Sequence, residues 1–335
     1  MSMSQFEQLD IGQVKTYSAR TRNSKVQSES EAKPLQAGMS VRQLLQSLPQ
    51  IMKAQELTEI AQAVVRARNK GKPVIAMLGG HVIKTGCAPV LADLMEQDFI
   101  THIAGNGSMA IHDAELELVG QTSEDVAAQL EDGSFGMAHE VAETLNSSAL
   151  LAAQKKLGFG EALGFSICTS RTNNIRRSLI AKAYQHNVPC TLHVALGTDI
   201  VHQHPSADGA AIGDASLRDF RILANSVSQL GDGGVVLNLG SAVIMPEVFL
   251  KTLAVARNLG YSVHGFTTAN LDMIQHYRPT VNVVQRPVLG SGQGYALTGH
   301  HEIMLPLLAV SIYEQAEDVR YIEFLAGGED NVYKR

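Results

Sequence analysis

The chain lacks tryptophan altogether, has only three cysteines among 335 residues, and carries charge on only 18% of them. Cys87, Cys168 and Cys190 cannot all pair and form no CxxC motif, which argues against a disulfide framework and against a structural zinc cluster. No apolar run reaches the roughly 18 residues of a membrane-spanning helix, and the first residues lack the basic and apolar segments of a signal peptide. These absences predict a cytoplasmic protein with no membrane partner.

A large excess of charge of one sign is also missing. The 27 basic and 33 acidic residues give a net charge of -6, which provides no electrostatic basis for nucleic acid as a partner. A hydrophobic share of 45% is enough for a large buried core. Residues 1–38 have no sustained apolar period and are expected to form an extended arm. Residues 39–335 show no break in composition and are expected to form a single large α/β domain.

Short apolar runs alternate with helical patterns through this second part. The runs that predict strands lie at 73–78, 99–105, 162–169, 188–196, 234–240 and 261–268. Helical periodicity separates several of them, at about 89–97, 175–187, 214–230 and 246–258. Buried strands joined by helices are typical of an α/β fold with a doubly wound, mostly parallel sheet of the Rossmann-like kind, and this is the fold class that we expect.

Glycine-rich turns follow several of these patterns, at 79–86, 104–108, 240–242 and 290–294. Ligands of open parallel sheets bind beyond the carboxyl ends of the strands, where glycine lets backbone N–H groups approach a phosphate. No turn matches the Walker A or GxGxxG pattern, so each one alone is equally explained as a tight turn. Lys84, in the first of these turns, is expected either to hold an anion or to be a solvated loop residue.

Histidine is frequent, with 12 in the chain, and several histidines cluster. His202 and His204 would share one face of extended backbone, and His300 adjoins His301. These side chains could bind a divalent metal, hold a substrate, or be satisfied polar loop residues. No HExxH or spaced Cys/His set selects the metal.

Several short segments occur in a fixed order between about residues 73 and 315. They include Ala195-Leu196-Gly197-Thr198-Asp199, Asp219-Phe220-Arg221, Leu239-Gly240-Ser241-Ala242, Thr267-Thr268-Ala269 and Leu305-Pro306-Leu307-Leu308. In this order they resemble the deoxyhypusine synthase family, NAD-dependent enzymes that move an aminobutyl group from spermidine to a protein lysine. The resemblance implies a deoxyhypusine synthase-type NAD-binding fold and a homotetramer. The NAD ligands that it implies are Gly79, Gly80, Thr85, Gly86, Ala104, Gly105, Asp199, Gly240, Ser241, Thr268 and Ala269.

Residues on which the family's own reaction depends are missing. Counting back without gaps from Leu305-Pro306-Leu307-Leu308 places Pro287 where the family has the lysine that forms a covalent imine. Proline cannot form an imine. His204 stands where the family has an acidic residue that binds the polyamine. We therefore expect an NAD-binding enzyme that couples hydride transfer to chemistry on a small metabolite, rather than a deoxyhypusine synthase.

The expected roles of side chains follow from their chemistry. Imidazole titrates near neutral pH, which makes His204, His300 and His301 candidate acid–base groups, with Lys84 as a further catalytic candidate on the cofactor turn. The expected substrate ligands are His112, Asp113, Glu115 and Arg286, and no metal ligand is assigned. Two alternatives stay open: a sensor or inactive paralogue that binds a nucleotide without chemistry, and a metal-assisted hydrolase that uses the histidine clusters.

Overall fold

The computed structural model describes residues 5–170 and 178–327, with side chains up to residue 318. The chain divides into two units, Met1–Met52 and Lys53–Arg335.

The first unit has little regular structure. Helix α1 begins where it does because Ser40 caps it: Ser40 Oγ accepts from the Gln43 N–H at 3.2 Å, and Gln43 Oε1 accepts from the Ser40 N–H at 2.7 Å. The regular elements of this unit are η1 (Ala19–Thr21), η2 (Ser28–Ser30) and α1 (Val41–Ser47). The expected arm at 1–38, followed by one domain at 39–335, stays a prediction.

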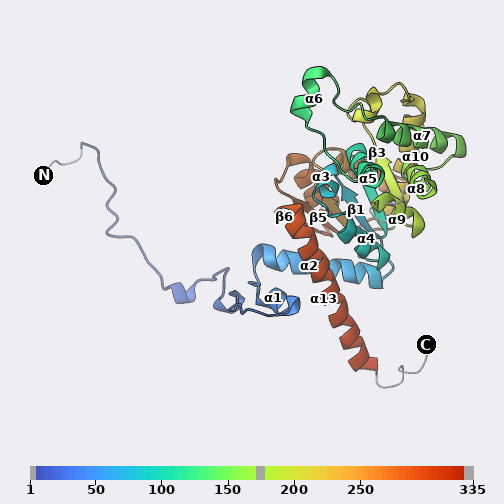
Figure 1. Ribbon diagram of the computed structural model, residues 1–335. Helices are drawn as coiled ribbons and strands as arrows, with labels where there is room; N and C mark the ends of the chain where they lie inside the picture. Colours follow the sequence, from blue (N-terminus) through green and yellow to red (C-terminus); the bar gives the residue numbers. More distant parts are fainter. Residues whose placement is uncertain (1–4, 171–177, 328–335) are drawn as a thin grey trace. The chain divides into compact units, whose positions relative to one another are not determined.

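The second unit is built on a six-stranded sheet with the order β3-β2-β1-β4-β5-β6, in which every neighbouring pair is parallel (Figure 1). The strands are β1 (Val74–Leu78), β2 (His102–Asn106), β3 (Cys190–His193), β4 (Val235–Leu239), β5 (Thr267–Asp272) and β6 (Gln293–Thr298). This is the strand order of doubly wound dinucleotide-binding folds, whose two halves meet between β1 and β4. The expected fold class is therefore confirmed.

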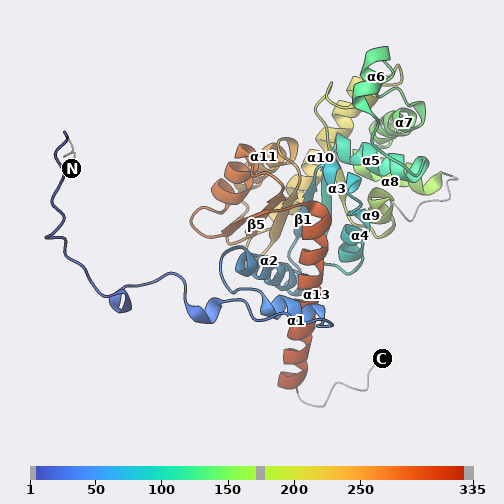
Figure 2. The same ribbon diagram turned by 60° about the vertical axis from the view of Figure 1, so that its left-hand side comes forward.

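Helices cover both faces of the sheet. One apolar cluster joins side chains of α2, α4 and α13 to one face, and a second joins α10 and α11 to the other. Figure 2 shows the long α13 helix passing α2. The helical elements are α2 (Met52–Asn69), α3 (Gly80–Lys84), α4 (Ala88–Glu96), α5 (Gly107–Leu118), α6 (Val126–Asp132), α7 (His139–Lys155), α8 (Phe159–Thr169), α9 (Leu179–Gln185), η3 (Ile200–Gln203), α10 (Gly209–Ser228), α11 (Ile244–Asn258), α12 (Tyr277–Pro279), η4 (Thr280–Gln285), η5 (Arg286–Val288) and α13 (His301–Gly327).

Burial on both faces explains the sequence of the central strands. Every residue of β1 and β4 is buried, so their sequences are nearly continuous apolar runs rather than alternating ones. Within the described parts of the chain, no helix combines the length and the apolar character needed to cross a membrane.

One expected strand is wrong. Residues 162–169 lie in α8, whose large buried side chains Phe159, Leu163 and Ile167 recur at helical spacing. Its small residues are buried as well: a Cβ on Gly160 would lie 2.1 Å from the Cys190 carbonyl oxygen of β3. Because α8 is packed on several sides, its apolar run hides the helical period.

The last two strands also differ from expectation. β5 starts only at Thr267, so most of the run at 261–268 is a loop. β6 was not expected, because its sequence, QGYALT, mixes polar residues and glycine with apolar ones. Its partly exposed residues fit an edge strand, which has no neighbour on one side.

Candidate functional site

The two halves of the sheet meet at a contact between two glycine backbones. The Gly79 N–H donates to the Leu239 carbonyl at 3.0 Å, and the Gly240 N–H donates to the Leu271 carbonyl at 3.2 Å. A Cβ on Gly79 would lie 2.1 Å from the Gly240 carbonyl oxygen, and Gly240 has a φ of +68°. Side chains are thus excluded at the carboxyl ends of β1 and β4, the position at which open α/β sheets bind ligands in a crevice.

Two buried asparagine side chains bond to each other and to the backbone of the turn that contains Gly240. Asn238 and Asn270 are register partners on β4 and β5. Asn238 Nδ2 donates to the Ser241 carbonyl at 2.9 Å and to Asn270 Oδ1 at 2.7 Å. Asn270 Nδ2 donates in turn to Gln275 Oε1 at 2.7 Å. The amide pair fixes the backbone that follows Gly240.

A second close approach joins the turn after β1 to α5. A Cβ on Gly80 would lie 2.1 Å from Ser108 Oγ and 2.9 Å from His112 Cδ2. A Cβ on Gly107, the first residue of α5, would lie 2.0 Å from Asp199 Oδ2. These glycines therefore make room for protein side chains, a role that the sequence-based interpretation as phosphate turns did not include.

A cavity of about 210 Å³ opens at this meeting point. Six of its lining residues are Lys84, Ser108, His112, Glu115, Thr198 and Asp199, which come from α3, from α5 and from the loop after β3. Four predicted site residues, Lys84, His112, Glu115 and Asp199, are thus brought together. The volume is below the roughly 300–1,000 Å³ typical of complete ligand pockets, so the cavity suits a small ligand or part of a larger one.

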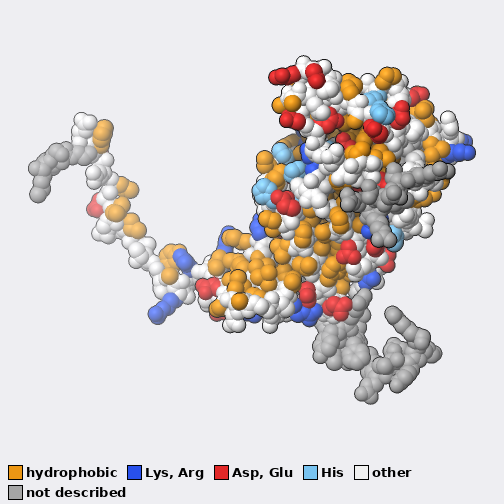
Figure 3. Space-filling view, in the orientation of Figure 1, with side chains coloured by type: hydrophobic (Ala, Val, Ile, Leu, Met, Phe, Trp, Pro, Cys, Tyr) orange, Lys and Arg blue, Asp and Glu red, His pale blue; other side chains and the backbone are white. Residues whose placement is uncertain are grey.

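A segment that contains α6 closes one side of this cavity. Glu124, Val126 and Phe135 line it, and a larger cavity of about 630 Å³ adjoins it through Glu115, Ser123 and Glu124. α6 projects from the second unit (Figure 1), and acidic side chains gather at its end (Figure 3). Since acidic side chains outnumber Lys84 around the 210 Å³ cavity, a ligand there must bring hydrogen-bond donors.

His112 is held by a carboxylate and a hydroxyl. Its Nδ1 lies 3.0 Å from Glu115 Oε2 and 2.7 Å from Thr122 Oγ1, and Thr122 donates to Glu115. Burial by itself would raise the pKa of Glu115, but the hydrogen bonds from His112 and Thr122 outweigh it and hold that pKa below its usual value. The carboxylate is therefore ionised at neutral pH.

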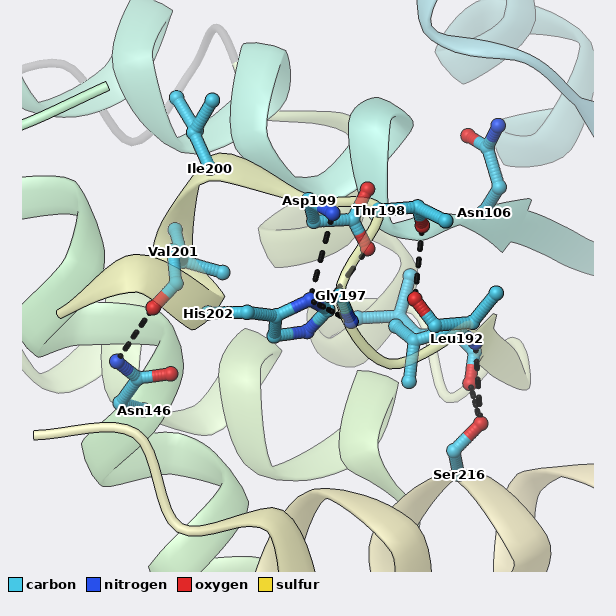
Figure 4. A network of polar contacts seen from close by, with 12 residues as sticks. Asn106, Asn146, Leu192, Gly197, Thr198, Asp199, Ile200, Val201, His202 and Ser216 are labelled. Atoms are coloured by element: carbon cyan, nitrogen blue, oxygen red, sulfur yellow. Dashed lines mark hydrogen bonds and ion pairs between the residues drawn. The ribbon is translucent and has the colours of Figure 1, made fainter. Parts of the chain in front are cut away.

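The loop after β3 carries Asp199 to the cavity (Figure 4). His202 Nδ1 accepts from the N–H groups of Gly197 and Asp199 at 3.2 and 3.3 Å, and Thr198 Oγ1 donates to the Ala195 carbonyl at 2.7 Å. Burial raises the pKa of Asp199, and His202 opposes the shift. His202 thus supports the loop.

Two histidine side chains, His81 and His301, lie next to each other near Gly240. The His81 and His301 rings are 5.6 Å apart, and burial, His301 and Lys84 lower the pKa of His81. His301 is buried, with Nε2 3.2 Å from the Leu271 carbonyl, and its Nδ1 has no partner among the residues that the structure describes. His300 is exposed, with Nδ1 3.9 Å from Glu302.

Other predicted site residues have neighbours of their own. Asp113 accepts from Ser178 Oγ at 2.5 Å and from the Leu179 and Ile180 N–H groups, so it caps α9; burial raises its pKa to about 6. His204 Nε2 donates to the Gly136 carbonyl at 2.9 Å. The remaining placements are Thr85 and Gly86 at the end of α3, Ala104 and Gly105 within β2, Thr268 and Ala269 within β5, Ser241 beneath the turn, and exposed Arg286 bonded to Asn282.

The sequence reasoning missed Ser108, Thr122, His81 and the amide pair. Ser108, His112 and Glu115 follow an i, i+4, i+7 spacing, which would have indicated one helix face. Asn238, inside an apolar strand run, was a second usable signal. Thr122 follows α5 in a loop, and no local pattern points to it.

Comparisons with known proteins support the fold. Residues 58–147, which include β1 and β2, match a family model described as arginine dihydrolase ArgZ-like, C-terminal, Rossmann fold. Nothing among curated proteins matches the chain.

Three solved structures are similar to the chain at low identity. AgrE in complex with ornithine and NAD+ is 14% identical at a TM-score of 0.50, over 80% of this chain and 33% of its own. Apo ArgZ, a cyanobacterial arginine dihydrolase, is 16% identical at 0.49, over 78% and 31%. A putative deoxyhypusine synthase from Entamoeba histolytica is 12% identical at 0.47, over 83% and 94%.

These likenesses are to the fold alone. The chain spans about a third of the length of the ArgZ and AgrE chains. The match to the ArgZ-like Rossmann model means that the resemblance noted in the sequence is to a related fold family and not specifically to deoxyhypusine synthase.

Proposed function

We propose that the chain is an NAD-binding enzyme, active as a homotetramer, that couples hydride transfer to chemistry on a small metabolite. The observation that carries this proposal is the junction of β1 and β4, where the Gly79 and Gly240 backbones touch in a sheet with the dinucleotide-binding strand order.

The turns at the β1–β4 junction are the proposed contacts of the dinucleotide. A Cβ at Gly79 would collide with the Gly240 carbonyl, one at Gly80 with Ser108 and one at Gly240 with His301, so glycine keeps the backbone of these turns closely packed. The proposed NAD contacts are the turns Gly79, Gly80, Thr85, Gly86, Gly240 and Ser241, with Asp199 beside them; Ala104, Gly105, Thr268 and Ala269 support these turns from within the strands. When bound, NAD would supply a hydride acceptor. The AgrE complex, which contains NAD+ and ornithine on a similar fold, supports this choice of ligand.

The chain's own residues would then bind the metabolite beside the crevice. Lys84, at the end of α3 next to the proposed NAD contact Thr85, is the basic side chain on the 210 Å³ cavity and suits the pyrophosphate of NAD. Glu124 and Asp199 suit hydroxyl or ammonium groups. His301, whose buried Nδ1 has no partner among the described residues, and His300 beside it stay candidate acid–base groups, whereas His204 bonds to the Gly136 carbonyl, Arg286 bonds to Asn282, and neither lines this cavity.

The alternatives differ in what they require. A nucleotide sensor would bind NAD without reducing it. A metal-assisted hydrolase would need a metal centre, and the described parts of the chain contain no group of three or more His, Cys, Asp or Glu side chains placed to hold one.

The test is NAD-dependent stabilisation of the full chain. At a hundredfold excess over Kd, NAD should raise the free energy of unfolding by about 2.7 kcal/mol. Lys84→Gln should weaken binding roughly tenfold by removing one charge-assisted contact. Lys70→Gln is the matched control, because Lys70 precedes β1 and so lies at the amino ends of the strands, opposite the proposed site.

The proposal is wrong if the wild type shows no stabilisation by millimolar NAD, NADH or NADP. Measuring whether NAD is reduced in the presence of a panel of hydroxy and amino acids then distinguishes the two alternatives. The enzyme reduces NAD with at least one of them, whereas the sensor binds NAD without reducing it.

A further inference from the structure

Three polar side chains share one face of α5. Ser108, His112 and Glu115 follow the i, i+4, i+7 spacing, and all three line the 210 Å³ cavity. The start of α5 is fixed because Asn106 Oδ1 accepts from the Met109 N–H at 3.0 Å. The face is therefore held toward the cavity by the strand end and the cap.

The contacts of His112 determine its tautomer. Glu115 is ionised and can only accept, and Thr122 donates its own hydrogen to Glu115, so both oxygens near His112 Nδ1 are acceptors. Neutral His112 must carry its hydrogen on Nδ1. The lone pair then lies on Nε2, at the opposite side of the ring.

The His112 ring lines the cavity and packs against the turn after β1. Its Cδ2, which is bonded to Nε2, lies 2.9 Å from the position of a Cβ on Gly80, and Ser108 Oγ lies 2.1 Å from the same position. The unprotonated nitrogen therefore belongs to a ring that borders both the cavity and the turn after β1.

From this geometry we infer that His112 is the acid–base residue of the site, with Glu115 and Thr122 as its positioning residues. The inference rests on the proposed function and assigns its proton transfer. A hydroxyl or amine of the bound metabolite gives its proton to Nε2, and the electron pair of the broken O–H or N–H bond stays on the ligand. The resulting imidazolium is balanced by the Glu115 carboxylate at 3.0 Å. The substrate class is a small alcohol or amine.

The charges that face the same cavity set the electrostatic conditions for this transfer. Lys84 from α3 disfavours the imidazolium, whereas Glu115 from α5, Glu124 from the α6 segment and Asp199 from the loop after β3 favour it. The acidic groups outnumber the lysine, and in a net oxidation with NAD as the hydride acceptor the proton taken by His112 would pass on to solvent.

Diethyl pyrocarbonate tests the tautomer without any substrate, because it acylates unprotonated imidazole nitrogens. Mass spectrometry of the treated wild type should find His112 modified, and saturating NAD should protect it, while exposed His139 is modified with or without NAD. Glu115→Gln keeps an acceptor oxygen and should keep the reactivity. Glu115→Ala/Thr122→Val removes both acceptors, so the 15N NMR shifts of the His112 ring should show the hydrogen on Nδ1 in the wild type and no longer held there in the variant.

A wild-type His112 ring that carries its hydrogen on Nε2 would overturn the assigned tautomer. NAD that stabilises the protein without protecting His112 would overturn its place at the crevice and leave the proposed function intact. Failure of NAD to bind at all would instead refute the proposed function.

Turnover tests the role itself. For each alcohol or amine of the panel that the wild type oxidises, His112→Gln should lower kcat by about 10²–10⁴-fold, with KM changed little. His186→Gln is the control, because this exposed imidazole follows α9, before β3 begins, and lies 3.8 Å from Glu96. Full turnover by His112→Gln would refute the assignment.

Discussion

Asp219 makes the stability of the protein depend on pH. Its carboxylate, fully buried in α10, accepts from the Leu192 N–H at 2.7 Å and from the Gly160 N–H at 3.0 Å, and so ties β3 to the start of α8. Burial, together with the negative charge of Glu161, outweighs these hydrogen bonds and raises the pKa to about 7 from 3.8. The folded protein therefore binds a proton between about pH 4 and pH 7 that the unfolded chain releases.

The sign and size of the effect follow from this shift. Because the folded pKa is the higher one, the stabilisation is fully present below about pH 4 and is lost as the pH rises to about 7. A difference of about three pH units corresponds to at most about 4 kcal/mol in the free energy of unfolding. Asp219→Asn keeps an acceptor oxygen but cannot ionise, so it removes this pH dependence.

Urea unfolding of both proteins between pH 4.5 and 8.5 measures the effect. The stability of Asp219→Asn relative to the wild type should rise with pH, by up to about 3 kcal/mol over this range. Asp214→Asn, on the same helix but half-exposed and paired with Arg218, should show no such trend. A constant difference between Asp219→Asn and the wild type across the pH range would refute the reasoning.

Two further predictions concern the crevice and the assembly. Gly79→Ala should destabilise the protein by about 1–3 kcal/mol in urea unfolding and weaken NAD binding, because the new Cβ would lie 2.1 Å from the Gly240 carbonyl. Gly213→Ala, in α10 with open space around it, should instead be neutral or stabilising by up to about 1 kcal/mol, and equal costs for the two variants would contradict the close contact. Light scattering after size exclusion should give about four times the mass of one chain, whereas a monomer at micromolar concentration would refute the tetramer.

The buried centre of the sheet could be read from the sequence. β1 and β4 are apolar along their whole length because both faces are covered, and such runs stand out from the helices around them. Glycine after each run marked the crevice as well, since few other residues allow two backbones to touch. The alternation of strands and helices was therefore enough for the fold class.

The sequence was less informative for elements whose number of covered sides is unusual for their type. α8 resembles a strand because helices and β3 surround it, and β6 resembles a loop because one of its edges has no partner. A hydrophobic pattern reports how many sides of an element are covered, and this depends on neighbours far away in the chain.

The chemistry of the site was decided by the tertiary structure. The sequence named His112, Asp113 and Glu115 together, yet the fold directs Asp113 to the start of α9 and pairs His112 with Glu115 and Thr122. Helical rotation separates neighbouring side chains by about 100°, so residues adjacent in sequence have different surroundings. Sequence alone determined that a doubly wound sheet with glycine turns would form; only the packing of α5 against the turn after β1 decided which imidazole lines the cavity and which carboxylate and hydroxyl hold it.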